Sequence, residues 1–366
     1  MTRDGEANDA WSIELLRGLA ALLVVAAHYV GLTGLQPWLL GFAFTGVDLF
    51  FVLSGFVFAP QLFGKRVSMA GHFIRRFFRL YPLYVVALAA YAIGRWVHGQ
   101  DNDHLIKHLL MAHTWQTREV AFHYNPAFWS LPPEVEYYLV LPLLALLCRG
   151  IVSVLWVTGV ALGLHVVLAW LSPVDPAATG LTWVLLFHLP ALLIEFMLGS
   201  LAWWVVQRRP GSAWRAIGLT LGLIGWLLLA NLFASLTAVG GEAAVLSSGV
   251  LRGNIGLLAA VAYALLVVAW VGWVRQPPAW LRSIALVMGN LSYGVYLFHN
   301  ALPQWLAPWR AMWPGWAFAG LCLAATLLLS QVLHKVWEGP CRAFGRRWAA
   351  RLEARRAEVG SMPSKR

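Results

Sequence analysis

The sequence has little charge and few cysteines, and each shortage excludes a class of protein. Only 12% of its 366 residues are charged, whereas 60% are hydrophobic. A soluble domain carries about 25% charged residues, so this composition excludes one. The three cysteines, Cys148, Cys322 and Cys341, are widely spaced in or beside apolar segments, which argues against a disulfide framework and a zinc site. The composition predicts an all-α fold, a polytopic bundle of transmembrane helices.

Long polar linkers are also missing, and we expect a single transmembrane domain over residues 1–340 followed by a basic cytoplasmic tail over 341–366. The tail is either a helix on the membrane surface or a solvated segment. Hydropathy predicts about ten spans. The predicted spans cover residues 12–32, 39–61, 80–97, 127–147, 151–171, 180–206, 214–236, 253–274, 282–302 and 312–336.

Basic residues are distributed unevenly over the predicted loops. With the N-terminus in the cytoplasm, all of the 27 Lys and Arg residues except five fall on the cytoplasmic side. The five exceptions are Arg95, Lys107, Arg118, Arg252 and Arg310. Positive residues accumulate on the cytoplasmic side of membrane proteins, so both termini are predicted to be cytoplasmic. The net charge of +11 then reflects topology and attraction to anionic lipid rather than nucleic-acid binding.

The first span carries three polar residues, Glu14, Arg17 and His28. Such groups are costly inside a membrane and mark functional sites by default. Arg17 and His28 lie three helical turns apart on one face, roughly 16 Å along the axis. The structural alternative is an arginine that reaches the interface and a histidine that is satisfied by a neighbouring helix.

Further polar residues occur in and after the second span. Asp48 either orients a polar partner or faces the outer water. Arg75, Arg76 and Arg79 cluster where the third helix meets the cytoplasmic surface, and Arg76 and Arg79 share a helix face. Guanidinium groups bind phosphate oxygens well, so these residues and Arg17 indicate an anion site. Simple anchoring at the cytoplasmic surface explains any single one of them equally well.

Several motifs occur together in a fixed order. These are Glu14-x-x-Arg17 with His28, GVDLFFVLSGF around Asp48, RRFFRLYPLY from Arg75, WSLPPE from Trp129 to Glu134, Glu-Phe-Met-Leu-Gly at 195–199, and SYGVYLFH from Ser292 to His299. In this order they resemble the membrane-bound acyltransferase family 3. Pro132 and Pro133 depart from the family pattern before Glu134, and no esterase-like second domain follows the core.

The resemblance implies an O-acyltransferase that moves an acyl group, usually acetyl, from cytoplasmic acyl-CoA to a hydroxyl group. It implies no permanently bound cofactor, since acetyl-CoA would be a substrate. Arg17, Arg75, Arg76 and Arg79 would hold the donor phosphates. His28 would act as general base, oriented by Glu134, or would carry the acyl group itself. The predicted substrate-binding or structural residues are Asp48, Trp129, Ser130, Ser292, Tyr293 and His299. Tyr293, His299 or an arginine such as Arg17 would stabilise the thioester oxyanion. Ser292 and Tyr296 are favoured as links between helices.

The polar interval 98–126 contains five histidines, which are His98, His104, His108, His113 and His123. No cysteine and no third ligand at a telling spacing accompany them, so we predict no metal site. A segment lining the acceptor entrance is the favoured interpretation. His165 and His188, inside spans, are expected to be packing residues.

One alternative belongs to another functional class. A transporter or flippase would use Arg17, His28 and Glu134 as a substrate or proton pathway. It predicts repeated halves, and the charged first and fourth spans have no counterparts in the second half. The preferred hypothesis is an enzyme of the bacterial inner membrane whose partners are acyl-CoA, membrane lipid and a carbohydrate, glycolipid or other hydroxyl acceptor. The acceptor, the acyl group and the oligomeric state stay open.

Overall fold

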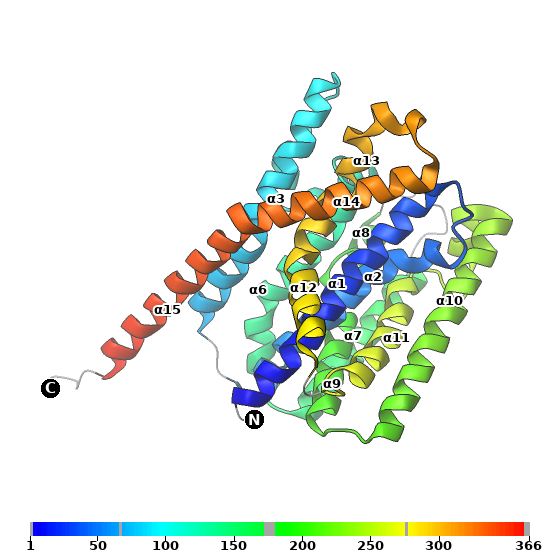
Figure 1. Cartoon of the computed structure of the whole chain (residues 1–366). Helices are drawn as coiled ribbons and strands as arrows, with labels where there is room; N and C mark the ends of the chain where they lie inside the picture. The colour runs from blue at the N-terminus through cyan, green and yellow to red at the C-terminus, as the bar shows by residue number, and fades with distance from the viewer. Residues whose placement is uncertain (1–2, 66–67, 172–179, 275–276, 362–366) are drawn as a thin grey trace.

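The computed structural model describes residues 3–65, 68–171, 180–274 and 277–361, which form helices and no strand (Figure 1). The longer helices are α1 (Arg3–Thr33), α2 (Gly46–Leu62), α3 (Met69–Val97), α6 (Leu131–Leu147), α7 (Ile151–Leu171), α9 (Leu189–Gln207), α10 (Ser212–Ser247), α11 (Ile255–Trp270), α12 (Ala279–Phe298), α14 (Gly315–Leu333) and α15 (Gly339–Ser361). Shorter elements are η1 (Trp38–Thr45), α4 (Leu105–Leu109), η2 (His113–Trp115), α5 (Arg118–Phe122), η3 (Pro126–Ser130), α8 (Leu181–Leu186), α13 (Ala301–Trp305), η4 (Ala307–Met312) and the π-helical η5 (His334–Glu338).

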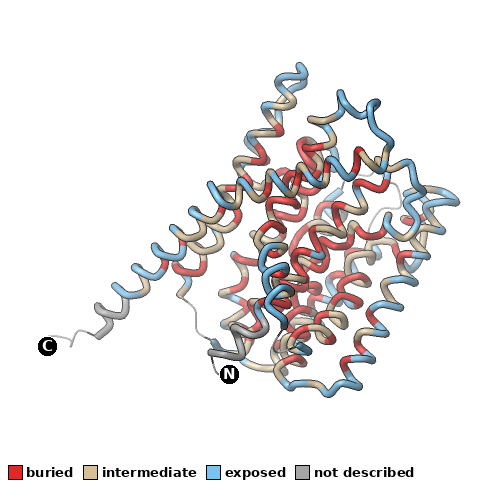
Figure 2. The backbone as a smooth tube through the Cα atoms, viewed as in Figure 1, coloured by how far each residue is buried: buried red, intermediate tan, exposed pale blue. Residues whose placement is uncertain are grey.

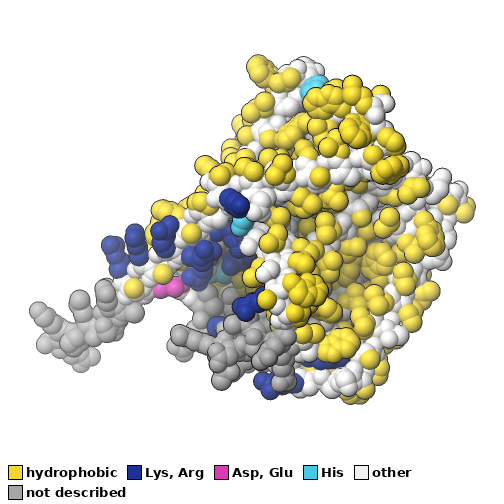
Figure 3. Space-filling view, in the orientation of Figure 1, with side chains coloured by type: hydrophobic (Ala, Val, Ile, Leu, Met, Phe, Trp, Pro, Cys, Tyr) yellow, Lys and Arg dark blue, Asp and Glu magenta, His cyan; other side chains and the backbone are white. Residues whose placement is uncertain are grey.

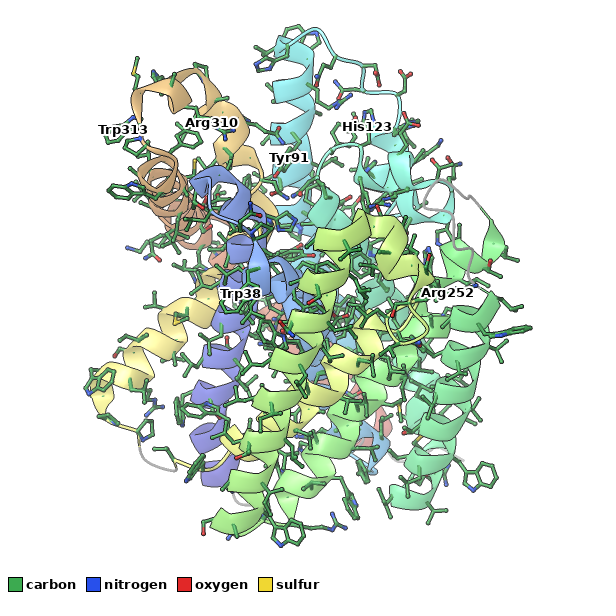
Figure 4. All side chains as sticks on the ribbon, turned by 90° about the vertical axis from the view of Figure 1, so that its right-hand side faces the viewer. Trp38, Tyr91, His123, Arg252, Arg310 and Trp313 are labelled. Carbon is green, nitrogen blue, oxygen red and sulfur yellow. The ribbon has the colours of Figure 1, made fainter. Side chains whose placement is uncertain are left out.

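The predicted all-α polytopic bundle is confirmed. Within the described residues, nine helices are long and apolar enough to cross a membrane. They correspond to nine of the ten predicted spans, and the remaining one, predicted over 253–274, is the shorter apolar helix α11 of 16 residues. Arg310, Trp313 and His123 lie near the upper end of the molecule (Figure 4), whereas the N-terminus lies at the lower end (Figure 1).

Two predicted boundaries move because hydropathy does not detect amphipathic or broken helices. The third helix begins at Met69 rather than at residue 80, and the Ser68 side chain caps it by accepting a hydrogen bond from the Gly71 backbone N–H at 3.3 Å. The seventh extends past residue 236 to Ser247, with a kink at Gly240 and Gly241. Gly241 has a φ of 62°, which glycine adopts without the steric cost that other residues incur.

The predicted tail begins without a break in the helix. α14 continues through η5 into α15, and α15 packs along α3, where the Phe78 ring centroid lies 5.2 Å from that of Phe344 and 5.9 Å from that of Trp348. Lys and Arg side chains gather along α15 in Figure 3, on a face that is otherwise largely hydrophobic. Of the basic residues used to predict orientation, Arg66, Arg275, Lys365 and Arg366 lie outside the described residues.

Buried residues concentrate in the central helices of the bundle, while α10 and α15 are largely exposed (Figure 2). α2 and α9 form the middle and approach each other closely. A Cβ atom at Gly55 would overlap the Phe196 carbonyl group, and one at Gly199 would overlap that of Val52. Small residues allow such backbone contact between membrane helices, and here they bring the polar residues of α2 and α9 to one place.

Candidate active site

A cavity of about 480 Å³ lies between α1, α2, α9, α11 and α12, and short segments of the 98–130 region close one side. Most of its lining is apolar. The polar and aromatic residues that line it include His28, Asp48, Trp129, Glu195 and Tyr296.

An exposed ion pair also lines this cavity. Arg118 of α5 contacts Glu242 of α10, with 2.5 Å between Nη1 and Oε1. Glu242 follows the kink in α10, so the kink determines where this ion pair forms. The cavity is therefore mainly hydrophobic with a few convergent polar groups, which is typical of small-molecule sites.

His28 is exposed to this cavity from α1. Its Nδ1 lies 2.8 Å from the carbonyl oxygen of Val24, one turn earlier in the same helix. A carbonyl accepts hydrogen bonds, so Nδ1 carries the proton and Nε2 is the acceptor of the neutral ring. The buried His299 ring lies edge-on to it at a centroid distance of 4.9 Å. This arrangement leaves Nε2 as a free acceptor, as a general base requires.

Glu134 does not contact His28 in this structure, which differs from the expectation that it orients the ring. Among the described residues, its Oε1 accepts hydrogen bonds from the hydroxyl of Tyr138 and from Ser54 Oγ, the latter at 3.5 Å. Its charge also interacts with Arg76 and Arg79. The backbone of Val24 instead orients His28. Sequence reasoning paired the two because both are polar groups in spans, but the rotation of α6 turns Glu134 toward α3.

Three of the four predicted donor-binding arginines come together near the N-terminal half of α1. Arg17 Nη1 lies 2.9 Å from Oε1 of Glu14, and the charges of Arg76 and Arg79 act on Arg17. We call Arg17, Arg76 and Arg79 the arginine cluster. The carboxylates of Glu14 and Glu134 balance part of its charge.

Aromatic rings and α15 account for the remaining contacts of these arginines. The Arg76 guanidinium stacks over the Phe58 ring at 4.9 Å. Arg75 points to another neighbour: its Nη1 pairs with Glu353 of α15 at 2.9 Å. Successive residues of a helix point about 100° apart, so Arg75 faces α15 while Arg76 and Arg79 face the cluster.

The remaining predicted site residues divide into two groups. Trp129 lines the cavity and packs against Phe187 at a centroid distance of 5.3 Å. Ser130 Oγ lies 2.6 Å from the hydroxyl of Tyr296, which belongs to the cavity wall. In contrast, Ser292 donates to the carbonyl oxygen of Gly289 in its own helix, and Tyr293 donates to that of Leu80 in α3. The Tyr293 hydroxyl therefore links α12 to α3, whereas that of Ser292 is satisfied within its own helix.

The structure also assembles polar residues whose pairing the sequence analysis missed. His188 Nδ1 lies 2.5 Å from Oε1 of Glu136, and the other carboxylate oxygen accepts the backbone N–H of Leu189. Glu195 lines the cavity beside Asp48, although sequence analysis noted it only as part of a motif. A carboxylate in an apolar span was the signal that pointed to Glu195.

Histidines of the 98–130 region form a cluster outside the spans. The rings of His108 and His113 stack with a centroid distance of 4.1 Å, and His123 lies 6.4 Å from His108. Burial and, to a smaller extent, the neighbouring His113 lower the pKa of His108 to about 3. Burial also lowers the pKa of His113 to about 4. In the described part of the chain, no three His, Cys, Asp or Glu side chains are placed to share a metal ion.

Comparison with known proteins now assigns the family. The model of the acyltransferase domain family matches residues 11–335. The chain belongs to this acyltransferase family. Acyltransferase MdmB from Streptomyces mycarofaciens is 28% identical over 92% of this chain and 92% of its own length.

Two further relatives illustrate how wide the family is. The putative acetyltransferase ORF330 of Acidianus two-tailed virus is 24% identical, covering 80% of this chain and 83% of its own. Peptidoglycan O-acetyltransferase OatA from Listeria monocytogenes is 26% identical over 91% of this chain, but over only 56% of its own length. No solved structure matches the chain. The predicted family is thus confirmed, and the chain is a multi-pass membrane acyltransferase.

Proposed function

We propose that this acyltransferase moves an acyl group, in the first instance acetyl, from cytoplasmic acyl-CoA to a hydroxyl group of a carbohydrate or glycolipid. The observation that carries the proposal is the arrangement of α1. This one helix contributes Arg17 to the arginine cluster and His28 to the cavity, roughly 16 Å apart along its axis. That length is comparable to an extended pantetheine arm.

The two ends of this arrangement suit the two substrates. Guanidinium groups of the arginine cluster would bind the phosphates of the donor nucleotide and leave its thioester to extend toward His28. The cavity, with Trp129 and its carboxyl groups, would hold the acceptor. We further propose the bacterial inner membrane as the location, with the arginine cluster at the cytoplasmic face, because the basic residues concentrate at that end.

The proposed chemistry requires little more than proton transfer and positioning. Nε2 of His28 takes the proton of the acceptor hydroxyl while its oxygen attacks the thioester carbonyl carbon. The tetrahedral intermediate then breaks its carbon–sulfur bond, and the coenzyme A thiolate takes the proton from the imidazolium. Arg17, Arg76 and Arg79 hold the donor throughout, and Val24 keeps the imidazole in the tautomer that has a free Nε2.

Purified protein in lipid nanodiscs tests the proposal directly. Radiolabelled acetyl-CoA is added with and without a glycan extract of the host, to wild type, His28→Ala and His165→Ala. His165 is a matched control, since it lines the same cavity and its Nδ1 contacts the Ala191 carbonyl oxygen at 3.0 Å.

We expect coenzyme A release that depends on the extract and falls about 100-fold or more in His28→Ala, with a small change in His165→Ala. Full transfer by His28→Ala would overturn the assigned base. Labelled protein that accumulates in the absence of acceptor would replace direct transfer by an acyl-enzyme.

A second experiment tests the proposed orientation in the membrane. Single cysteines that replace Arg208 and Arg310 should react with a membrane-impermeant thiol reagent from opposite sides.

A further inference from the structure

Two carboxyl groups from different helices meet in the wall of the cavity. Asp48 is on α2 and Glu195 is on α9, and both face Gly256 at the start of α11. A Cβ atom at Gly256 would lie 2.6 Å from Glu195 Oε1 and 2.7 Å from Asp48 Oδ1. The two oxygens therefore lie close together beside Gly256, and a side chain at 256 would collide with both of them.

The protein itself leaves this pair incompletely hydrogen-bonded. Glu195 is 0% exposed to bulk solvent and Asp48 5%. Neither carboxyl oxygen of Glu195 has a donor among the described residues. A buried carboxyl group without donors is unfavourable, because it has lost its hydrogen bonds to water and gained none in the protein. A pair of adjacent carboxyl groups can also bond to each other if they share one proton, which still leaves acceptor oxygens unused.

Nearby polar side chains already have other partners. The Tyr263 hydroxyl accepts a hydrogen bond from Trp226 at 2.9 Å and lies 3.1 Å from Thr45 Oγ1. The hydroxyl of Tyr296 donates to the carbonyl oxygen of Ala127 at 2.6 Å. Arg118 pairs with Glu242. The oxygens of Glu195 are therefore free to accept hydrogen bonds from the contents of the cavity.

We propose that Asp48 and Glu195 form the acceptor subsite and bind a neutral polyhydroxylated ring through two neighbouring hydroxyl groups. Each hydroxyl donates a hydrogen bond to a carboxyl oxygen, and Trp129, in the same cavity, offers a flat aromatic surface to the C–H groups of the ring. Another hydroxyl of the same molecule then reaches His28. The inference rests on the proposed function, since it assumes that the cavity receives the acceptor.

The chemistry of the pair favours hydroxyl groups of a sugar over other ligands. An anionic acceptor group would be repelled by carboxyl oxygens in an apolar wall. A ring lacking hydroxyl groups would leave Glu195 unsatisfied, and sites built for hydrogen bonding reject such analogues strongly. A protonated amine is the competing ligand, and the experiment separates the two.

The first measurement is chemical labelling of the wild-type protein in nanodiscs with dicyclohexylcarbodiimide, which modifies protonated carboxyl groups in apolar surroundings. Mass spectrometry should find Glu195 or Asp48 modified in the absence of ligand. A neutral methyl glycoside with adjacent hydroxyl groups should slow the modification at least threefold, whereas its dideoxy analogue should not. Equal rates of modification with the glycoside and with its dideoxy analogue would overturn the proposal. If only an amino sugar slows the modification, the ligand of the pair is an ammonium group instead of hydroxyl groups.

The second measurement uses kinetics with the host glycan extract. Glu195→Gln, Asp48→Asn and Gly256→Ala should each raise the acceptor concentration needed for half-maximal coenzyme A release by about tenfold. Their affinity for coenzyme A should not change. Glu119→Gln is the control, because this exposed carboxylate does not line the cavity.

The two proposals can fail separately. If wild type releases no coenzyme A with any acyl-CoA, the proposed function fails, while the labelling experiment still tests the subsite. If wild type is active and Glu195→Gln, Asp48→Asn and Gly256→Ala keep the wild-type acceptor dependence, the subsite is wrong and the transfer reaction stands.

Discussion

Helix α1 joins the cavity to the arginine cluster, yet the polar groups of the two regions differ in whether the protein supplies their partners. In the arginine cluster, Arg17 pairs with Glu14, and the charge of Glu134 acts on Arg76 and Arg79. In the cavity wall, the carboxyl groups of Asp48 and Glu195 lie together, and the oxygens of Glu195 have no hydrogen-bond partner among the described residues. The cavity is therefore preformed for a ligand, while a donor at the cluster must compete with carboxylates of the chain itself. Binding of the donor should accordingly change side-chain contacts more than binding of the acceptor.

The largest effect that distinguishes the two regions is expected for Arg79→Gln. Removing one guanidinium from the cluster takes away charge-assisted hydrogen bonds to phosphate, which contribute about 1.5–3 kcal/mol. Coenzyme A should bind at least tenfold more weakly to protein in nanodiscs, measured by equilibrium dialysis, while the acceptor dependence stays unchanged. Arg208→Gln is the control, since this exposed arginine at the end of α9 donates to the Trp204 carbonyl oxygen. Equal affinity for Arg79→Gln and wild type would show that the cluster only anchors the helices.

A substitution at the interface of α15 tests whether this helix belongs to the donor region. Gly345 packs against Phe78 so closely that a Cβ atom there would overlap it. Gly345→Val should separate α15 from α3, lower cross-linking between cysteines placed at 75 and 353, and weaken coenzyme A binding a few-fold. Ala350→Val, on an exposed face of the same helix, should change neither. Intact cross-linking in Gly345→Val would mean that α15 accommodates the added side chain.

Acid should destabilise the segment that contains His108 and His113. The pKa of His108 is lowered to about 3 and that of His113 to about 4, whereas an unfolded histidine titrates near 6.5. The unfolded segment therefore binds more protons, and folding of this segment loses stability as the pH falls from about 6.5 toward 4. Limited proteolysis in the 104–125 region should accelerate over this range, and His108→Gln should reduce the acceleration. His98→Gln, at an exposed position, is the control. A proteolysis rate that does not depend on pH would show that His108 and His113 are not buried as neutral groups.

The smallest expected effect is a gain in coenzyme A affinity, whereas the substitutions in the arginine cluster and at α15 lower it. Glu14→Gln removes the carboxylate that pairs with Arg17 at 2.9 Å and leaves the guanidinium available to phosphate. Exposed and half-buried pairs contribute about 0.2–1 kcal/mol, so coenzyme A affinity should rise about two- to fivefold. The same dialysis assay measures it, with Glu119→Gln as an exposed control. Weaker binding in Glu14→Gln would mean that Glu14 positions Arg17 rather than competing for it.

Residue patterns predicted most of the fold and singled out individual polar residues, because hydropathy and charge are local properties. Apolar runs located the nine helices long enough to cross a membrane and the shorter α11, and the polar residues within them made His28, Arg17 and Asp48 candidates for the site. Hydropathy missed the first turns of α3, where the arginines interrupt the apolar run although Ser68 already caps the helix. It also ended the last span at residue 336, inside η5, although the helix continues into α15, since a helix that packs along α3 does not need to be apolar on every side.

The sequence by itself determined the membrane fold, the spacing of Arg17 and His28 on one helix, and the family, all of which depend on residues near one another in the chain. The tertiary structure alone decided the partners of each polar group. Glu134 faces Tyr138 and the arginines rather than His28, Arg75 faces Glu353, and Asp48 meets Glu195 beside Gly256. Such pairings depend on how each helix is rotated about its axis, and close contacts between distant segments, such as Gly55 against Phe196, set that rotation.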